Sequence, residues 1–271
     1  MIFVSEIDKV RYSRKAYIAF LGITLLPILF LFSSESGLRG GDASAATNTP
    51  ASDGWQLIIT SMNFALHIFA PLLCAMVASD TIAGERSNGM LSLSLTKPVT
   101  RNRYLMNKLL VQMLVVIATF IVFAASSFVL GEILGFKTFY GVKNETGLPS
   151  TDTIIPTNEI WWRMLAFYTF AILGTMVVVF FTIAFSTYSD SVATVTALTV
   201  ILYMSSEIFG EMIRTSSYYK YLLSPAIKTV VWSLLSPTVD WSLIHECLLI
   251  LLGYAIIALG ITFHRFNNRD I

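Results

Sequence analysis

Long runs of apolar residues alternate with polar stretches along this chain. Each run is long enough to cross a lipid bilayer, which takes roughly 20 mostly apolar residues. Because a helix satisfies its own backbone hydrogen bonds in lipid, such runs predict transmembrane helices. The pattern predicts an all-α membrane protein with one transmembrane domain, residues 1–271, and six spans. The spans are expected at about residues 16–32, 55–79, 109–131, 164–187, 191–213 and 243–263.

The polar segments predict the orientation of the chain, because Lys and Arg accumulate on the cytoplasmic side of a membrane. With the N-terminus inside, the inner segments hold Lys9, Arg11, Arg14, Lys15, Arg86, Lys97, Arg101, Arg103, Lys108, Arg265 and Arg269. The outer segments are longer in total yet hold fewer cations: Arg39, Lys137, Lys143, Arg163, Arg214, Lys220 and Lys228. Both termini are therefore expected in the cytoplasm, in a multi-pass protein of the cell membrane.

The chain before the first span has the pattern of an amphipathic helix. Phe3, Ile7, Val10 and Arg14 recur at helical spacing, with charges at other positions. Residues 1–15 are therefore expected to form a helix lying on the inner leaflet.

The segment 216–242, after the fifth span, repeats the tetrad Leu-Leu-Ser-Pro, ending at Pro225 and at Pro237. Serine followed by proline suits a helix start, with serine as the cap and proline in the first turn. The apolar run between the prolines is about half a membrane thick. We expect two short outer helices that dip into the membrane without crossing it. The alternative is an interfacial loop anchored by Trp232 and Trp241.

Composition agrees with a membrane protein and excludes several chemistries. The chain is 55% hydrophobic and only 13% charged, whereas a soluble domain has about 25% charged residues. Its net charge of +1 gives no reason to expect a nucleic-acid partner. Cys74 and Cys247 lie in apolar runs and are expected to be buried small hydrophobes. The sequence has no phosphate-binding Gly-x-x-x-x-Gly-Lys-Ser/Thr loop, so no catalytic, cofactor or metal site is expected.

The polar stretch 80–108 separates two of the most apolar runs and has features of a shaped surface. Gly84 and Gly89 permit close approach or bending. A short rigid helix is expected over 86–96, and Pro98 ends it. Cations at the start of the next helix, including Arg101, oppose the helix dipole. Lipid phosphates or an acidic protein partner would each explain them.

Several residues of this stretch resemble the signature of the ATP-binding-cassette (ABC) transporter permeases of the type-two export class. They are Ala83-Gly84-Glu85-Arg86, then Gly89, then Lys97-Pro98-Val99-Thr100-Arg101, and finally Lys108 at the mouth of a span. The basic N-terminal helix, the six spans, the short outer helices and the ending 266–271 are also similar to that family. Met90 and Thr100 depart from it, standing where Thr and Ser are common.

The resemblance implies that this stretch couples the chain to a separate ATPase subunit. In such permeases, helices between spans two and three seat in a groove of the ATPase, and the chain is dimeric. The implied partners are two ATP-binding subunits, which hold ATP and Mg²⁺, and a second permease chain, identical or related. The implied coupling residues are Gly84, Glu85, Arg86, Gly89, Leu91, Lys97, Pro98 and Arg101. A solvated loop that obeys the positive-inside rule is the structural alternative.

Polar residues within the spans are candidates for a translocation path, because they avoid lipid and face the bundle or a cavity. Asn63 and His67 lie one turn apart in span two, and Glu207 and Glu211 repeat this spacing near the outer end of span five. A gate lined by Glu207 is one expectation. Interhelical hydrogen bonding, or pairing of Glu207 with a neighbouring lysine, is the structural alternative.

Two other classes of function remain as alternatives. A secondary transporter driven by an ion gradient predicts inverted repeats and charged midplane sites, and the Leu-Leu-Ser-Pro echo is the only internal repeat noted. An intramembrane enzyme or sensor requires a polar catalytic constellation, which the sequence lacks. An ATP-driven exporter subunit is the function that the sequence favours.

Overall fold

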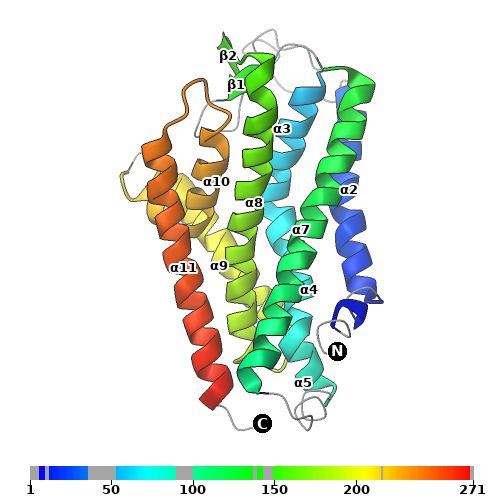
Figure 1. The fold of residues 1–271 in the computed structure, drawn as a ribbon, viewed down its shortest axis with the longest axis vertical. Coiled ribbons are helices and arrows are strands. Elements are labelled where there is room, and N and C mark those ends of the chain that lie inside the picture. The colour runs from blue at the N-terminus through cyan, green and yellow to red at the C-terminus, as the bar shows by residue number, and fades with distance from the viewer. Residues whose placement is uncertain are drawn as a thin grey trace.

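The computed structural model describes residues 6–9, 12–35, 53–89, 100–136, 139–142, 149–214 and 216–268. Within them, long helices run side by side in an elongated bundle (Figure 1). The first part of the chain forms α2 (Arg14–Glu35), α3 (Gly54–Phe64), the π-helical segment η1 (Ala65–Phe69), α4 (Ala70–Ser79), a second π-helical segment η2 (Asp80–Gly84) and α5 (Glu85–Ser87). The second part forms α7 (Arg101–Leu134), strands β1 (Tyr140–Val142) and β2 (Pro149–Ile154), α8 (Thr157–Ser186), α9 (Val192–Met212), the 3-10 turn η3 (Tyr219–Tyr221), α10 (Leu223–Ser233) and α11 (Trp241–Asn268).

Within the described residues, four helices are long and apolar enough to cross a membrane: α7, α8, α9 and α11. A fifth crossing is reached if Gly54–His67 and Ala70–Ser87, which meet at a bend of 45°, are counted as one span. The apolar part of α2, Ala16–Phe32, is shorter. The chain is therefore helical and consistent with a multi-pass membrane protein, as its sequence pattern predicts.

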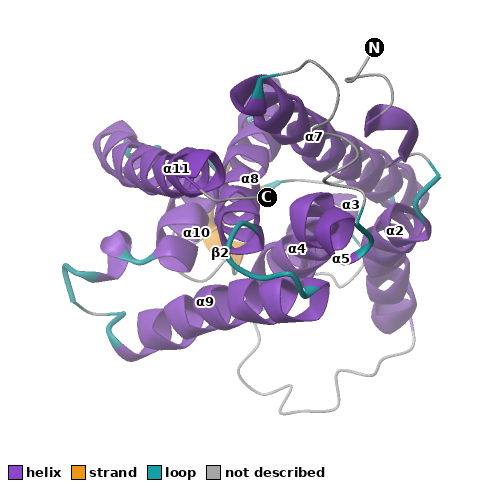
Figure 2. Cartoon of the chain, turned by 90° about the horizontal axis from the view of Figure 1, so that it is seen from below, coloured by secondary structure: helices purple, strands orange, loops and turns teal. Residues whose placement is uncertain are grey.

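The helices are arranged around α8, which packs against α4, α7, α9, α10 and α11. Seen along the bundle, α8 occupies the middle and α2 lies at the periphery (Figure 2). α2 begins and α11 ends at the same end of the bundle, where α5 also lies, and β1 and β2 lie at the opposite end (Figure 1). Both ends of the described chain are thus at the same end of the bundle.

The expected N-terminal helix is wrong in its extent. Residues 6–9 are helical, but the helix does not continue to residue 15, because the chain turns at Tyr12 and Ser13 and α2 begins at Arg14. Phe3 and Val10 lie outside the described residues.

The two short outer helices are also corrected, since the described part of 216–242 contains one α-helix, α10, after the turn η3. α10 has Pro225 in its first turn, as expected, although Leu222 and not Ser224 occupies the N-cap position. The second tetrad ends this helix: the Ser236 hydroxyl donates to the carbonyl oxygens of Ser233 and Thr238. Ser236 is therefore occupied in closing α10 and does not start a new helix.

A short antiparallel hairpin, unexpected from the sequence, lies between α7 and α8. β1 and β2 pair Tyr140 with Ile154 and Val142 with Pro149. Just before β1, the buried ring of Phe139 lies 5.7 Å from that of Trp55 at the start of α3. This aromatic contact packs the hairpin against the end of the bundle.

α3 and α7 approach each other closely at Gly54 and Gly131. A Cβ atom added at Gly54 would lie 2.4 Å from the carbonyl oxygen of Gly131. Because this oxygen belongs to the backbone of α7 and cannot move aside as a flexible side chain could, we expect Gly54→Ala to destabilise the protein by about 1–3 kcal/mol. Thermal denaturation of the detergent-purified protein measures the loss. Gly253→Ala is the matched control, since a Cβ atom there meets nothing within 4 Å; equal melting temperatures for the two variants would contradict this packing.

Candidate functional site

The segment between α4 and α7 is a rigid extension of α4 that ends in a turn. α4 continues without interruption through η2 into α5, and the chain then turns at Asn88 and Gly89. Gly89 has a φ of +68°, a conformation that glycine adopts without strain. The expected helix over 86–96 is therefore wrong at its start, because the helix ends at Ser87. Leu91, Lys97 and Pro98 lie outside the described residues.

Small and hydroxyl-bearing residues pack the segment from Ser79 to Gly84 against the antiparallel pair α8 and α9. The amide of Ala83 donates to the Ser186 hydroxyl at 2.8 Å. The hydroxyls of Ser79 and Thr196 are 2.8 Å apart. A Cβ atom at Gly84 would lie 2.3 Å from Oδ1 of Asp80, so the close approach expected at Gly84 is observed, with Asp80 as the neighbour.

Glu85 is buried in the protein's own interior, with 8% of its surface exposed. Its carboxylate lies 2.7 Å from Nζ of Lys9 and 2.7 Å from Nζ of Lys108, and it accepts a hydrogen bond from the Tyr104 hydroxyl. Lys108 also donates to the carbonyl oxygen of Thr81 at 2.6 Å. We call the group Glu6, Lys9, Glu85, Tyr104 and Lys108 the inner charge cluster.

The inner charge cluster joins four parts of the chain. Glu6 completes it, with its carboxylate 3.0 Å from Lys9 and 3.5 Å from Lys108. The ring of Tyr104 stacks on Phe266 near the end of α11, with ring centroids 6.2 Å apart. The N-terminal helix, α5, α7 and α11 therefore meet around one buried carboxylate.

The cluster also fixes the charge of its most exposed member. Partial burial lowers the pKa of Lys9, but the hydrogen bonds and negative charges of Glu85 and Glu6 outweigh this effect, and the pKa of Lys9 is raised above 10.5. Lys9 is therefore an ammonium ion at neutral pH and remains paired with the two carboxylates.

The two arginines of the expected coupling surface also contact the chain itself. Arg86 lies 2.8 Å from Asp190 in the connection between α8 and α9. Arg101 is exposed, and its Nη1 donates to the carbonyl oxygen of Asn267 at 3.2 Å. Among the charged residues of the expected coupling surface that the structure describes, Arg101 is exposed, whereas Glu85 is buried in the bundle.

A second cluster of charges lies in the opposite half of the bundle and joins η1, α9 and α10. Nδ1 of His67 is 2.9 Å from Oε1 of Glu207 and 2.6 Å from Nζ of Lys228. Glu207 also contacts Lys228 and the Ser224 hydroxyl directly. The side chains of Glu207 and Lys228 are 14% and 9% exposed, and that of His67 is 37% exposed. We call His67, Glu207, Ser224 and Lys228 the outer charge cluster.

Both ring nitrogens of His67 lie within hydrogen-bond distance of charged groups in this cluster. Nδ1 is close to Glu207 and Lys228, and Nε2 is 3.2 Å from Nζ of Lys228. A ring nitrogen accepts a hydrogen bond when it is unprotonated and donates when it carries hydrogen. The imidazole can therefore donate to Glu207 from Nδ1 and accept from Lys228 at Nε2.

The structure brings together two of the four candidate path residues. His67 and Glu207 are in contact, whereas Glu211 is exposed and lies 3.5 Å from Arg214. Asn63 is half-buried in α3, one turn before His67. The lysine pairing considered for Glu207 is observed, and its partner, Lys228, was missed. A lone cation in the short apolar run 226–236 was the available signal.

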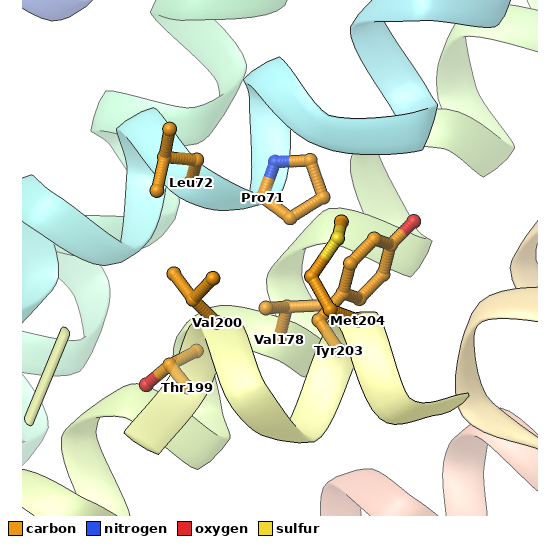
Figure 3. Close-up of a pocket in the computed structure, with 7 residues that line it drawn as sticks. All are labelled: Pro71, Leu72, Val178, Thr199, Val200, Tyr203 and Met204. Carbon is orange, nitrogen blue, oxygen red and sulfur yellow. The ribbon is translucent and has the colours of Figure 1, made fainter. Parts of the chain in front are cut away.

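A small apolar cavity of about 110 Å³ lies one helical turn from the outer charge cluster. Pro71 and Leu72 of α4 face Val200, Tyr203 and Met204 of α9 across it (Figure 3). The Tyr203 hydroxyl donates to the carbonyl oxygen of Leu66 in η1 at 2.6 Å, so the cavity adjoins a π-helical turn. Such turns occur often at functional sites.

The described residues contain no group of three or more His, Cys, Asp or Glu side chains that could hold a metal ion. Cys74 and Cys247 are buried free thiols.

A protein-family model described as "Protein of unknown function (DUF2705)" matches residues 19–271. No curated protein matches the chain. The match covers both charge clusters except for Glu6 and Lys9.

Proposed function

We propose that this chain, which belongs to the DUF2705 family, is the membrane-spanning permease subunit of an ATP-driven ABC exporter. In this proposal α2, the bent α3–α4 pair, α7, α8, α9 and α11 are six spans, and both termini are cytoplasmic. Two such chains, identical or related, pair with two ATP-binding subunits. ATP and Mg²⁺ bind to those subunits, and cargo leaves the cytoplasm or the membrane.

The observation that carries the proposal is the anchorage of the segment between α4 and α7. Its helical part continues α4 directly, and Glu85 ties it to Lys9 and Lys108. A displacement applied to this segment therefore reaches α4 and α7 together, because no slack loop lies between α4 and Glu85. A segment that transmits force from a partner needs this stiffness.

In this proposal Glu85 and Arg101 have different roles. Glu85 is buried and acts as the internal brace, whereas Arg101 is exposed at the same end of the bundle. Exposed charges of this kind set register and association rate more than affinity. We therefore assign the partner contact to Arg101 and Lys97, and the internal brace to Glu85.

Co-purification tests the proposal. The chain is co-expressed with any P-loop ATPase encoded by a neighbouring gene, and the complex is isolated through a tag on the chain. We expect two ATPase copies per two permease chains, and loss of the ATPase in the charge-reversal variant Lys97→Glu/Arg101→Glu. Glu132→Arg, an exposed charge reversal at the far end of α7, is the control. An undiminished complex with the double variant would contradict the assigned contact, and no complex with wild type would contradict the function.

The outer charge cluster favours a second candidate, a secondary transporter driven by an ion gradient. Buried ionisable groups beside a bent helix are typical of such transporters, and His67 lies at the bend between α3 and α4. This candidate predicts that the chain alone, in liposomes, moves protons when a pH gradient is applied. The exporter proposal predicts no flux without the ATPase.

A further inference from the structure

Polar contacts in the outer charge cluster hold the first half of α10 against the rest of the bundle. The amide of Ser224 donates to the Ser206 hydroxyl at 2.9 Å, and Glu207 contacts both Ser224 and Lys228. Lys228 also contacts His67 of η1. α10 lies in the half of the bundle that ends at β1 and β2 (Figure 1), and these contacts join it there to α9 and to the π-helical turn.

The charges that contact His67 come from α9 and α10. α3 and α4 pack against η1 and carry no charged side chain, and the charged residues of α2 lie at its two ends. α9 presents Glu207 to the imidazole, and α10 presents Lys228. Further ionisable groups on these elements are Cys74 of α4 and Tyr203, Glu211 and Arg214 of α9. One carboxylate and one ammonium group therefore face the ring directly.

Protonation of His67 changes one of its two contacts from attractive to repulsive. A neutral imidazole can donate to Glu207 from Nδ1 while Nε2 accepts from the ammonium of Lys228, 3.2 Å away. A protonated imidazole carries hydrogen on both nitrogens and accepts at neither. It also places a second positive charge beside Lys228, and Glu207 is then shared by two cations.

We propose that the outer charge cluster is a proton-binding site that controls the attachment of α10. The cluster holds α10 while His67 is neutral, and it releases Lys228 when His67 takes up a proton. Lys228 is the group that moves, because its stem is flexible, whereas the imidazole is held on η1 between α3 and α4. Since an imidazole changes its charge between about pH 5 and 8, mild acid is the signal that loosens α10.

Hydrogen–deuterium exchange of the detergent-purified chain tests this site. Exchange of the α10 amides is measured at about pH 7.5 and about pH 5.5, near the two ends of the range in which an imidazole titrates. The rates are corrected for the intrinsic effect of pH on exchange, and α7, which carries no histidine, is the internal reference. We expect acid to accelerate exchange in α10 by about tenfold or more, the factor that one hydrogen bond to a charged group supplies.

Two substitutions have different expected responses to acid. His67→Gln keeps a neutral donor and acceptor at this position, so α10 should exchange equally at both pH values. Lys228→Met removes the competing cation, so protonated His67 becomes the counterion of Glu207 and acid should slow exchange in α10. His245→Gln, which replaces an exposed histidine at the start of α11, is the control and should respond as the wild type does. Size-exclusion chromatography verifies that each variant is folded.

Three outcomes would overturn the proposal. Equal exchange of wild-type α10 at the two pH values would show that no proton acts on the cluster in this range. Equal acceleration in the wild type and in His67→Gln would place the responsive group elsewhere. Acceleration by acid in Lys228→Met would show that repulsion between two cations is not the cause. Because the chain is used alone and without a pH gradient, none of these outcomes bears on the exporter function or on proton transport.

Discussion

Replacing Lys108 by methionine is expected to destabilise the protein by about 3–5 kcal/mol, because it leaves the buried carboxylate of Glu85 without its closest fully buried cation. The side chain of Lys108 is 1% exposed, and its ammonium contacts Glu85, Glu6 and the carbonyl oxygen of Thr81. Methionine fills a similar volume but supplies neither the charge nor the hydrogen bonds. Thermal denaturation in detergent, followed by size-exclusion fluorescence, measures the loss.

Two further variants distinguish this electrostatic effect from general damage to α7. Arg103→Met alters an exposed cation on the same helix and should change stability by no more than about 0.5 kcal/mol. The double variant Lys108→Met/Glu85→Gln removes both charges and should recover part of the loss. A double variant that is less stable than the two single variants combined would show that the Lys108–Glu85 pair is not the cause.

Glu207→Gln is expected to destabilise the protein by about 3–5 kcal/mol as well, since it leaves the buried ammonium of Lys228 beside His67 without a carboxylate. If the outer charge cluster is a gate, the same variant also changes ATP-dependent export by the reconstituted complex. The double variant Glu207→Gln/Lys228→Met should regain stability without regaining regulated export. This separates the role of the cluster in folding from its role in transport.

The matched control for Glu207 is Glu211→Gln, one turn further along α9. Glu211 is exposed, and its pairing with Arg214 at 3.5 Å is a surface contact, which contributes about 0–1 kcal/mol. We therefore expect its melting temperature and its export to be those of the wild type. Unchanged export and unchanged ATPase stimulation in Glu207→Gln would remove the gate proposal.

The long helices could be predicted from the sequence, because an apolar run of membrane length satisfies its backbone hydrogen bonds in lipid by forming a helix. Runs 109–131 and 243–263 lie within α7 and α11, whereas run 164–187 extends one residue beyond the end of α8 and run 191–213 one residue beyond each end of α9. The short polar connection near Ser189 likewise forces α8 and α9 into an antiparallel pair. α7 and α11 extend beyond their runs at both ends, since hydropathy marks the lipid-facing length and not the hydrogen-bonded length.

The sites were predicted less well, because their partners are distant in sequence. Glu85 meets Lys9 from 76 residues away, and His67 meets Lys228 from 161 residues away. The resemblance to ABC permeases assigned Glu85 to a contact with a partner protein, whereas its burial places it inside the bundle. The cations at the start of α7 were expected to contact lipid phosphates or an acidic partner, whereas Lys108 contacts Glu85 of the same chain.

The π-helical turn at Ala65–Phe69 is a place where the chain can lose one residue without changing the direction in which the next helix faces. A π-turn contains one residue more than an α-helical turn needs, because its hydrogen bonds span five residues instead of four. Deleting one residue there would restore regular α-helical winding, and Pro71 and Leu72 would still face α9. The same deletion in the regular part of α8 would rotate all later residues of that helix by about 100°. A single-codon deletion in the π-turn is therefore expected to be much better tolerated than one in the middle of α8.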